Sequence, residues 1–250
     1  MFNAKEQTEK IISFIRDYFE KNHLGGVVLG ISGGKDSAAV AGLFSLALGK
    51  ENVVGLTLPC HSMQSDSDDA HKVAEKFGFE LLNVDLTEVD NIFQKELKSA
   101  LKAEDEAQYK DSSINLKPRL RMSSCYYVAA ALSKIRQKTF IVAGTSNKSE
   151  LYVGYFTKGG DSVHDISVLA DLTVDEVVAI GEYIGVPDEV IHKTPSDGLS
   201  GMSDEQKLGV SYVNITKVIR GELTEGEEFD KIEALHKKTA HKFTIPTYRK

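Results

Sequence analysis

A glycine-rich segment with a lysine and an aspartate follows the first strongly apolar stretch of the chain. Residues 30–37 read GISGGKDS, and a helical pattern begins at about residue 36. Glycines at the start of a helix leave backbone N–H groups unpaired beside the positive end of the helix dipole, where an anion binds readily. The segment therefore predicts a loop that binds phosphate.

This loop differs from the common phosphate loop GxxxxGK[ST], in which a hydroxyl residue after the lysine binds magnesium. Here Asp36 follows Lys35, and only three residues separate the outer glycines. Phosphate repels a carboxylate unless a cation lies between them, so Asp36 predicts Mg²⁺ shared by the protein and a polyphosphate. A glycine turn with a helix-capping aspartate is the alternative. Two consecutive glycines and the flanking Ser32 and Ser37 disfavour it.

The segments around the loop predict the elements that position it. Apolar residues recur at helical spacing between about residues 5 and 22, which predicts an amphipathic helix. Short apolar, β-branched runs alternate with helical patterns along the following chain, which is typical of a parallel sheet. These predicted strands are residues 26–31, 51–58, 79–84 and 139–144. The predicted fold class is α/β, with a doubly wound, mainly parallel, Rossmann-like sheet and helices on both faces, so ligands should bind beyond the carboxyl ends of the strands.

The rest of the chain contains several predicted helix starts and three irregular stretches. Capping boxes are predicted for the pairs Thr173 with Glu176, Ser203 with Gln206, and Thr224 with Glu227. Three polar stretches give no regular pattern and are expected to be functional loops. They are residues 103–117, 145–165 and 192–204. A length of 250 residues favours a single domain, 1–250.

Composition excludes several classes of function. The formal net charge of −7 disfavours a general nucleic-acid binder, and no apolar run approaches the roughly 18 residues of a membrane span. A polar N-terminus without a signal-peptide pattern and two isolated cysteines favour a cytoplasmic protein. Four of the seven histidines show no metal-ligand spacing, so solvated or capping roles are expected for them. These are His61, His71, His164 and His192.

Four segments, in order, resemble a known family. SGGKDS (32–37) is similar to the pyrophosphate-binding loop of the ATP pyrophosphatase superfamily. NLKPRLRM (115–122), AGTSNKSELYVGYFTKGGD (143–161) and KTPSDGLSGMSDEQKLGVSY (193–212) resemble, in order and spacing, blocks of the ammonia-dependent NAD synthetases. The likeness runs from about Ile11 to Tyr212. A further match, a histidine and a lysine at positions 241 and 242, lies near the end of the chain.

The resemblance implies a reaction. Members of this family adenylate nicotinic acid adenine dinucleotide (deamido-NAD) with ATP, release pyrophosphate, and let ammonia attack the acyl adenylate to give NAD. Members that use glutamine carry an additional hydrolase domain, which does not fit in these 250 residues, so ammonia is the expected nitrogen donor. The resemblance also implies a homodimer whose substrate site is formed across the subunit boundary.

The resemblance also implies roles for particular residues. Asp36 and Glu150 would hold Mg²⁺ and act in catalysis. We expect Lys35, which departs from the family pattern, to act with them. The ATP-binding residues would be Gly30, Ile31, Ser32, Gly33, Gly34, Lys35, Asp36, Ser37, Thr145 and Ser196. The deamido-NAD-binding residues would be Arg119, Lys158, Asp165, His241 and Lys242. Arg119 and Arg121 are two positions apart on a predicted helix, so only one should point into the site.

Departures from the family pattern leave alternatives open. Many relatives have a lysine that binds ATP where this chain has Val174, and Lys35 occupies a position where many have an apolar or amide residue. We expect Lys35 to supply the positive charge that Val174 lacks. The same chemistry on nicotinic acid mononucleotide, a tRNA-modifying adenylating enzyme, and a nucleotide-binding sensor without turnover are the competing interpretations.

Overall fold

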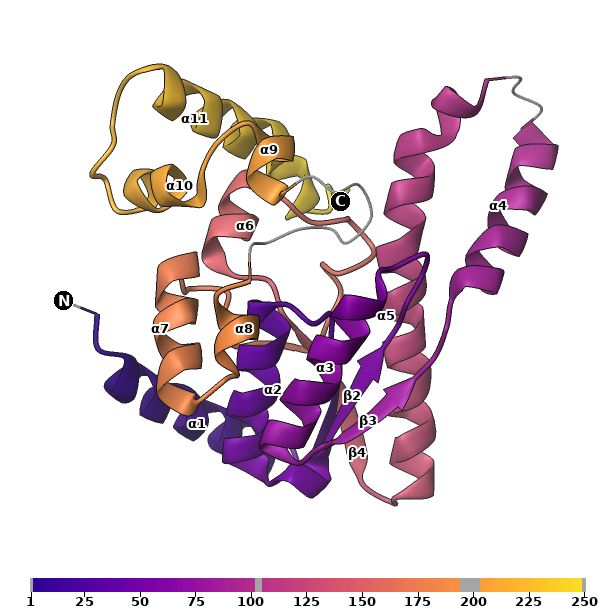
Figure 1. Cartoon of the computed structure of the whole chain (residues 1–250), viewed down its shortest axis with the longest axis vertical. Coiled ribbons are helices and arrows are strands. Elements are labelled where there is room, and N and C mark those ends of the chain that lie inside the picture. Colours follow the sequence, from indigo (N-terminus) through magenta and orange to yellow (C-terminus); the bar gives the residue numbers. More distant parts are fainter. Residues whose placement is uncertain (1, 102–104, 194–202, 249–250) are drawn as a thin grey trace.

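The computed structural model describes residues 2–101, 105–193 and 203–248 (Figure 1). In these ranges five parallel strands form one sheet in the order β3-β2-β1-β4-β5. Their bounds are β1 Leu24–Gly30, β2 Val53–Thr57, β3 Glu80–Asn83, β4 Thr139–Gly144 and β5 Ile166–Ser167. The four strands predicted from sequence are confirmed to within two residues at each end, and the two-residue β5 was not predicted.

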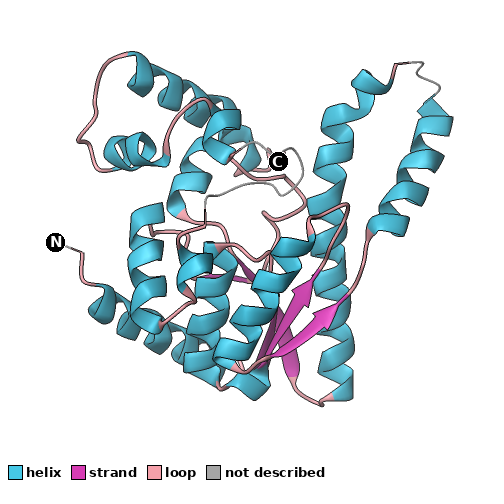
Figure 2. Cartoon of the chain, in the orientation of Figure 1, coloured by secondary structure: helices cyan, strands magenta, loops and turns pink. Residues whose placement is uncertain are grey.

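Helices cover both faces of the sheet (Figure 2). On one face Val27 and Leu29 of β1 pack against α1 (Ala4–Lys21), α2 (Lys35–Leu48), α3 (Gln64–Phe77), α7 (Val174–Ile184) and α8 (Asp188–Ile191). On the other face Val28 packs against α5 (Lys110–Ile135), with α4 (Thr87–Leu101) beside it. Because successive residues of a strand point to opposite faces, a strand buried on both is apolar throughout, as predicted. The α/β fold class is confirmed.

A third apolar cluster lies beyond the carboxyl ends of the strands. It joins α6 (Lys148–Val153), α10 (Tyr212–Ile219) and α11 (Glu227–Thr239), with Ile215 and Ile232 fully buried at its centre. Figure 1 shows these helices above the sheet, with α9 (Asp204–Leu208) next to them. Short 3₁₀ turns complete the description: Lys50–Asn52, Glu106–Tyr109 and Ala240–Lys242.

Three predictions about local structure were wrong. The stretch 103–117 was expected to be a loop, but α5 begins at Lys110 and continues through Pro118. Proline removes one helical hydrogen bond and favours a boundary, a local penalty that packing of the long helix on β1 and β4 outweighs here. The loop 145–165 contains α6. No capping box forms at Thr224, because α11 starts after Gly226, whose φ of 101° a residue with a side chain rarely adopts.

Candidate active site

The reversal of strand order between β1 and β4 creates the main cavity. The chain moves outward from β1 to β2 and β3, then returns to place β4 on the other side of β1. The loops that follow the two central strands must therefore diverge, which leaves a crevice at their carboxyl ends. A cavity of about 840 Å³ lies there and is lined by residues 30–36 after β1 and by Thr145 and Glu150 after β4.

The glycine loop is shaped by its own side chains and by one close backbone approach. Gly33 has φ 76°, and a Cβ atom there would lie 2.3 Å from the Asp66 carbonyl oxygen, so only glycine fits. Ser37 donates a hydrogen bond from its hydroxyl to the Gly34 carbonyl (3.0 Å) and accepts one from the Ser32 amide (3.2 Å). Gly34, the N-cap of α2, has no side chain to occupy the first N–H groups of the helix, so these can bind an anion.

Asn147 joins the two predicted metal-binding carboxylates. Its side-chain amide donates to Asp36 Oδ1 at 2.9 Å, and its backbone amide donates to Glu150 Oε2 at 3.1 Å. Asn147 is fully buried, and its Oδ1 accepts from the Glu150 amide in a capping box at the start of α6. Asp36 and Glu150, from opposite sides of the switch point, thus share one buried hydrogen-bonding residue at the mouth of the glycine loop.

Electrostatics at this point favour a cation. Burial, followed by the nearby Asp36 carboxylate, raises the pKa of Glu150 well above its ordinary value. Lys35 is only 5% exposed, and its ammonium lies 2.8 Å from Asp36 Oδ2. Burial opposes the charge on Lys35, but the carboxylates of Asp36 and Glu150 outweigh it and raise its pKa. The ammonium therefore stays charged and neutralises part of the negative charge.

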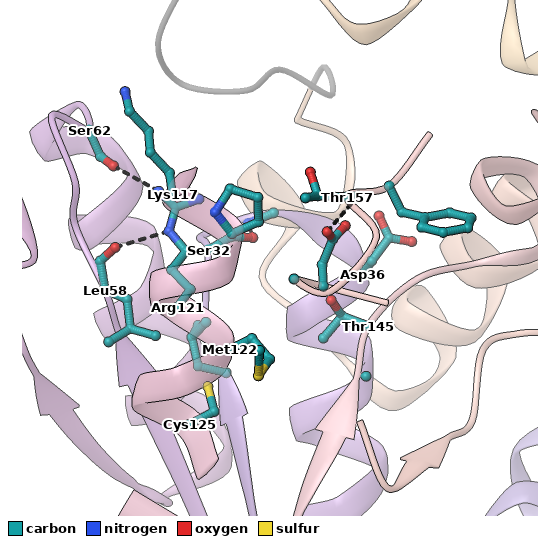
Figure 3. A pocket seen from close by; sticks show the side chains of 18 of the residues that line it. Ser32, Asp36, Leu58, Ser62, Lys117, Arg121, Met122, Cys125, Thr145 and Thr157 are labelled. Atoms are coloured by element: carbon teal, nitrogen blue, oxygen red, sulfur yellow. Dashed lines mark hydrogen bonds between the residues drawn. The ribbon is translucent and has the colours of Figure 1, made fainter. Parts of the chain in front are cut away.

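A basic wall faces the glycine loop across the cavity (Figure 3). Arg121 on α5 donates to the Leu58 carbonyl (3.1 Å) and to Ser62 Oγ (3.3 Å), which fixes its guanidinium at the end of β2. Lys117 lines the same wall one helical turn earlier. Lys242 donates to the carbonyls of Gly154 and Phe156, and burial lowers its pKa. Cations on both walls, with carboxylates beside the glycine loop, suit a polyphosphate held with a metal ion.

The cavity brings together most of the residues predicted to bind ATP, but few of those predicted for the second substrate. Residues 30–36, Thr145, Glu150 and Lys242 line it. Ser37 does not line the cavity; it is buried, and its hydroxyl stabilises the loop by donating to the Gly34 carbonyl. Ser196 lies outside the described residues.

The other predicted substrate residues lie outside the cavity lining. Arg119 donates to the Lys158 carbonyl (3.2 Å from Nη2) and lines a separate groove between α4 and α5. Asp165 accepts hydrogen bonds from the Tyr126 hydroxyl (3.1 Å) and the Val142 amide (2.8 Å). The His241 ring is exposed and contacts the Lys238 carbonyl. Arg119 and Arg121 do point in different directions, as predicted, but Arg121 is the one in the main cavity.

Two polar residues of the site, one amide and one carboxylate, were given no role from the sequence. Asn147 bridges the carboxylates, and Asp204, 8% exposed, lines the cavity and accepts a hydrogen bond from the Tyr155 hydroxyl (2.9 Å). The segment Asn147 to Glu150 fits the pattern of an N-cap followed three residues later by glutamate, so a search for capping boxes finds Asn147. No local pattern marks Asp204 as part of the site.

These features define a class of protein: an α/β nucleotide-binding protein whose switch-point cavity combines a glycine-rich phosphate loop with paired carboxylates. The family model described as NAD synthase matches residues 7–246. The chain therefore belongs to the NAD synthase family.

Individual relatives agree with this family. The chain is 36% identical to the NH(3)-dependent NAD(+) synthetase of Carboxydothermus hydrogenoformans over 98% of this chain and 97% of that protein. It is similar to the structure of NMN synthetase from Francisella tularensis, with a TM-score of 0.87 and 30% identity, covering 100% of this chain and 99% of the other. It is also similar to NH3-dependent NAD synthetase from Campylobacter jejuni, with a TM-score of 0.77, 29% identity and complete coverage of both chains. Within the described ranges, no helix is both long and apolar enough to cross a lipid bilayer.

Proposed function

We propose that this protein is a carbon–nitrogen ligase that converts deamido-NAD and ammonia to NAD, using ATP and releasing AMP and pyrophosphate. The relatives named as NH(3)-dependent NAD(+) synthetases support this activity. The observation on this chain that carries it is the meeting of Asp36 and Glu150 through Asn147 beside the glycine loop. That arrangement suits cleavage of ATP between its α and β phosphates.

We propose that Asp36 and Glu150 hold Mg²⁺. The donor set fits, because both side chains offer hard carboxylate oxygens and line one cavity. A cation would also offset the effect of burial and of Asp36, which together raise the pKa of Glu150. When bound, Mg²⁺ would supply stabilisation of the negative charge on the phosphate oxygens. Asn147 keeps both carboxylates oriented toward the loop.

The chain's own groups account for the rest of the proposed mechanism. N–H groups of residues 33–36 would bind the phosphates, with Ser32 and Thr145 adjacent. Lys35 and Arg121 would stabilise the charge that develops on pyrophosphate as it leaves. Activation is needed because a carboxylate is a poor electrophile at neutral pH, and attaching AMP to its oxygen provides a leaving group that ammonia can displace. Positioning of the reactants and stabilisation of the phosphate charge, rather than a general base, would account for most of the rate enhancement.

We propose that deamido-NAD binds through Arg119, Lys158, Asp165, His241 and Lys242, partly outside the ATP cavity. A homodimer with a substrate site shared across the subunit boundary would bring a second chain to this region. Support comes from exposed apolar side chains on α4, beside Arg119, and on α5. They include Ile92, Phe93, Leu97, Leu101, Tyr127 and Ile135.

The organisation and location of the protein are further parts of the proposal. Residues 1–250 would form one synthetase domain in the cytoplasm. The net charge of −7 supports small-molecule substrates over nucleic acid as partners.

The test is release of pyrophosphate together with formation of NAD. ATP, Mg²⁺, ammonium and deamido-NAD should give one pyrophosphate per NAD, and omission of deamido-NAD should abolish both. Absence of pyrophosphate with the complete mixture would point instead to a nucleotide-binding sensor.

Nicotinic acid mononucleotide is the second candidate substrate. The structure named NMN synthetase has a higher TM-score than the NH3-dependent NAD synthetase from Campylobacter jejuni, 0.87 against 0.77. Steady-state kinetics with both substrates decide the matter: the dinucleotide should have the higher kcat/KM, and a much higher value for the mononucleotide would reverse the assignment.

A further inference from the structure

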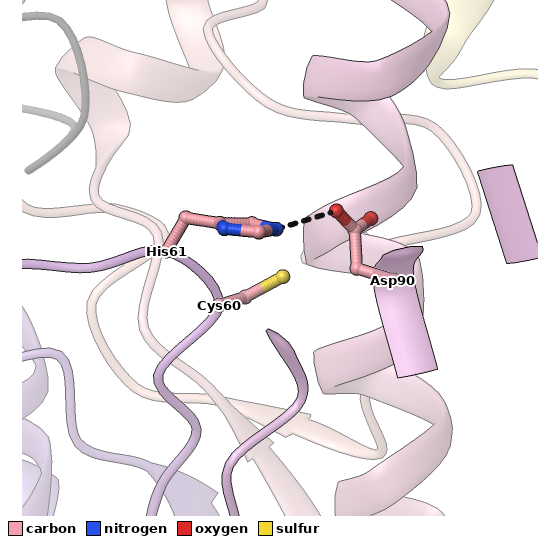
Figure 4. A group of neighbouring side chains, drawn as sticks. All are labelled: Cys60, His61 and Asp90. Carbon is pink, nitrogen blue, oxygen red and sulfur yellow. Dashed lines mark hydrogen bonds and ion pairs between the residues drawn. The ribbon is translucent and has the colours of Figure 1, made fainter. Parts of the chain in front are cut away.

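A sulfur, a nitrogen and a carboxylate lie together behind the wall of the main cavity. Cys60 and His61 belong to the loop between β2 and α3, and Asp90 lies in the first turn of α4 (Figure 4). One ligand atom from each residue lies within 4.8 Å of the other two. His61 was expected to have no metal-binding role, because spacing along the chain does not reveal its proximity to Asp90.

The positions of these groups are held by several contacts. His61 adopts φ 58°, a left-handed conformation that is uncommon for a residue with a side chain. Its backbone amide donates to Thr87 Oγ1 at 3.2 Å, and its ring Nε2 lies 3.2 Å from Asp90 Oδ2. Gln94 donates to the same Asp90 oxygen at 2.7 Å, and Gln94 in turn accepts from Ser113 Oγ. The carboxylate is thus oriented by a second layer of hydrogen bonds, as metal-binding carboxylates are.

Asp90 has an unsatisfied oxygen. The residue is fully buried, and its Oδ1 has no hydrogen-bond partner in the described part of the chain. A buried carboxylate oxygen without a partner is costly, and such an atom calls for an explanation. A cation bound at Oδ2, the oxygen that faces His61, would offset the buried negative charge that the two oxygens share.

We propose that Cys60, His61 and Asp90 bind a divalent transition-metal ion of the zinc type, at a site separate from Asp36 and Glu150. Thiolate, imidazole and carboxylate are three of the usual zinc ligands, whereas Mg²⁺ takes oxygen ligands only. Two ligands on one tetrahedral zinc, each about 2.0–2.1 Å from it, lie about 3.3 Å apart, close to the Nε2–Oδ2 separation of 3.2 Å.

Charge and access are compatible with the ion. Burial and the nearby Asp90 carboxylate raise the pKa of the Cys60 thiol, so a bound ion must displace its proton. The thiolate and the carboxylate then together neutralise a divalent cation. Binding releases the thiol proton and replaces the His61–Asp90 hydrogen bond. The His61 side chain is 39% exposed, so solvent reaches one side of the site and water would be the fourth ligand.

An ion at this site would fasten the wall of the main cavity to α4. The neighbouring residues Leu58 and Ser62 of the same loop hold the Arg121 guanidinium. We therefore expect metal to raise the Tm without being required for turnover.

Cobalt titration of chelator-treated protein tests the proposal, because a cobalt–thiolate bond gives a charge-transfer band in the near-ultraviolet that oxygen ligands do not give. The band should saturate at one Co²⁺ per chain and be displaced by Zn²⁺. Cys60→Ser should abolish it, and Asp90→Asn and His61→Gln should each weaken binding more than about 10-fold.

Matched controls separate this site from others. Cys125→Ser removes the other cysteine of the chain, which lies on α5, and Asp36→Asn alters the proposed Mg²⁺ site. Both should keep the band, and His71→Gln should leave affinity unchanged. Circular dichroism verifies that each variant is folded, and the exposed His61 side chain makes His61→Gln informative even if Cys60→Ser fails to fold. Absence of the band in the wild-type protein, its persistence in Cys60→Ser, or unchanged affinity in His61→Gln overturns the proposal.

Discussion

The two ends of the proposed active site are assembled in different ways. At the phosphate end, the glycine loop after β1 and the residues after β4 meet in one cavity, and Asn147 links Asp36 to Glu150. At the proposed dinucleotide end, Arg119 contacts the Lys158 carbonyl and Asp165 contacts Val142 of β4. Neither these residues nor Lys158 line that cavity. The difference teaches that residues of one chain assemble the phosphate cavity, whereas the residues proposed for the second substrate do not share a cavity in this chain. Under the proposed homodimer, a second subunit would complete that second site.

Removal of a carboxylate at the phosphate end should have the largest effect. Asp36→Asn or Glu150→Gln should lower kcat/KM by about 100-fold or more, because charge stabilisation at the phosphates is lost. Steady-state pyrophosphate release measures the loss. Asp171→Asn, a change at a 94%-exposed side chain paired with Lys148, is the matched control and should stay within about 2-fold of wild type. Full activity in a Glu150→Gln variant would contradict the proposed role of the two carboxylates at the phosphate end.

Lys35 should have the next largest effect. Lys35→Ala should lower kcat/KM for ATP by about 10-fold or more, since it removes a buried positive charge beside the phosphates. The double variant Lys35→Ala/Val174→Lys should recover part of that loss if the two positions supply the same charge. Unchanged ATP affinity and turnover in Lys35→Ala would rule out this compensation.

The two arginines of α5 should separate the substrates. Arg121→Ala should raise the KM for ATP by about 10-fold, because Arg121 faces the phosphate cavity. Arg119→Ala should leave the KM for ATP nearly unchanged and raise the KM for deamido-NAD. Parallel kinetics with each substrate varied in turn provide the measurement. Equal effects of both variants on the KM for ATP would contradict the division into two ends.

The smallest effect concerns an ion-pair contact between α10, which belongs to the third apolar cluster, and α7, which covers the sheet. Arg220 at the end of α10 pairs with Asp175 (2.8 Å) and Glu176 (3.2 Å) at the start of α7. Burial raises the pKa of Asp175, but hydrogen bonds from Thr173 and Arg220 outweigh burial and lower it. Because these groups are partly exposed, Arg220→Ala should reduce the free energy of unfolding by only about 0.5–1 kcal/mol at pH 7.

The pH dependence of this pair has a defined sign. A lowered folded-state pKa contributes stability above the unfolded value of about 3.9, and that contribution is lost as pH falls through the lowered pKa. The difference between wild type and Arg220→Ala should therefore shrink below about pH 4. Urea unfolding at pH 7 and at pH 3 measures it. A difference of the same size at both values would show that the pair contributes through packing rather than charge.

Local sequence was sufficient to predict four of the five strands described in the sheet, and the glycine loop. Strands buried on both faces are continuous apolar runs, and Asp36 after two glycines has a direct chemical meaning in a phosphate loop. The place of Glu150 came from the resemblance to the family, and the structure adds the reason for it: the capping box with Asn147 fixes its side chain.

Long-range packing decided what the sequence did not reveal. The continuation of α5 through Pro118 depends on contact with β1 and β4. The rotation of that helix then determines which of Arg119 and Arg121 enters the cavity, and spacing of two residues predicts only that they differ. Likewise, Cys60 and His61 meet Asp90 because the start of α4 packs on the loop after β2, which no short pattern encodes.

The most direct test of the account is a crystal structure with a nonhydrolysable ATP analogue and Mn²⁺ in place of Mg²⁺. The account predicts an anomalous peak coordinated by Asp36, Glu150 and phosphate oxygens at the glycine loop. A triphosphate bound elsewhere, or bound at the loop with no ion between it and the two carboxylates, would contradict it.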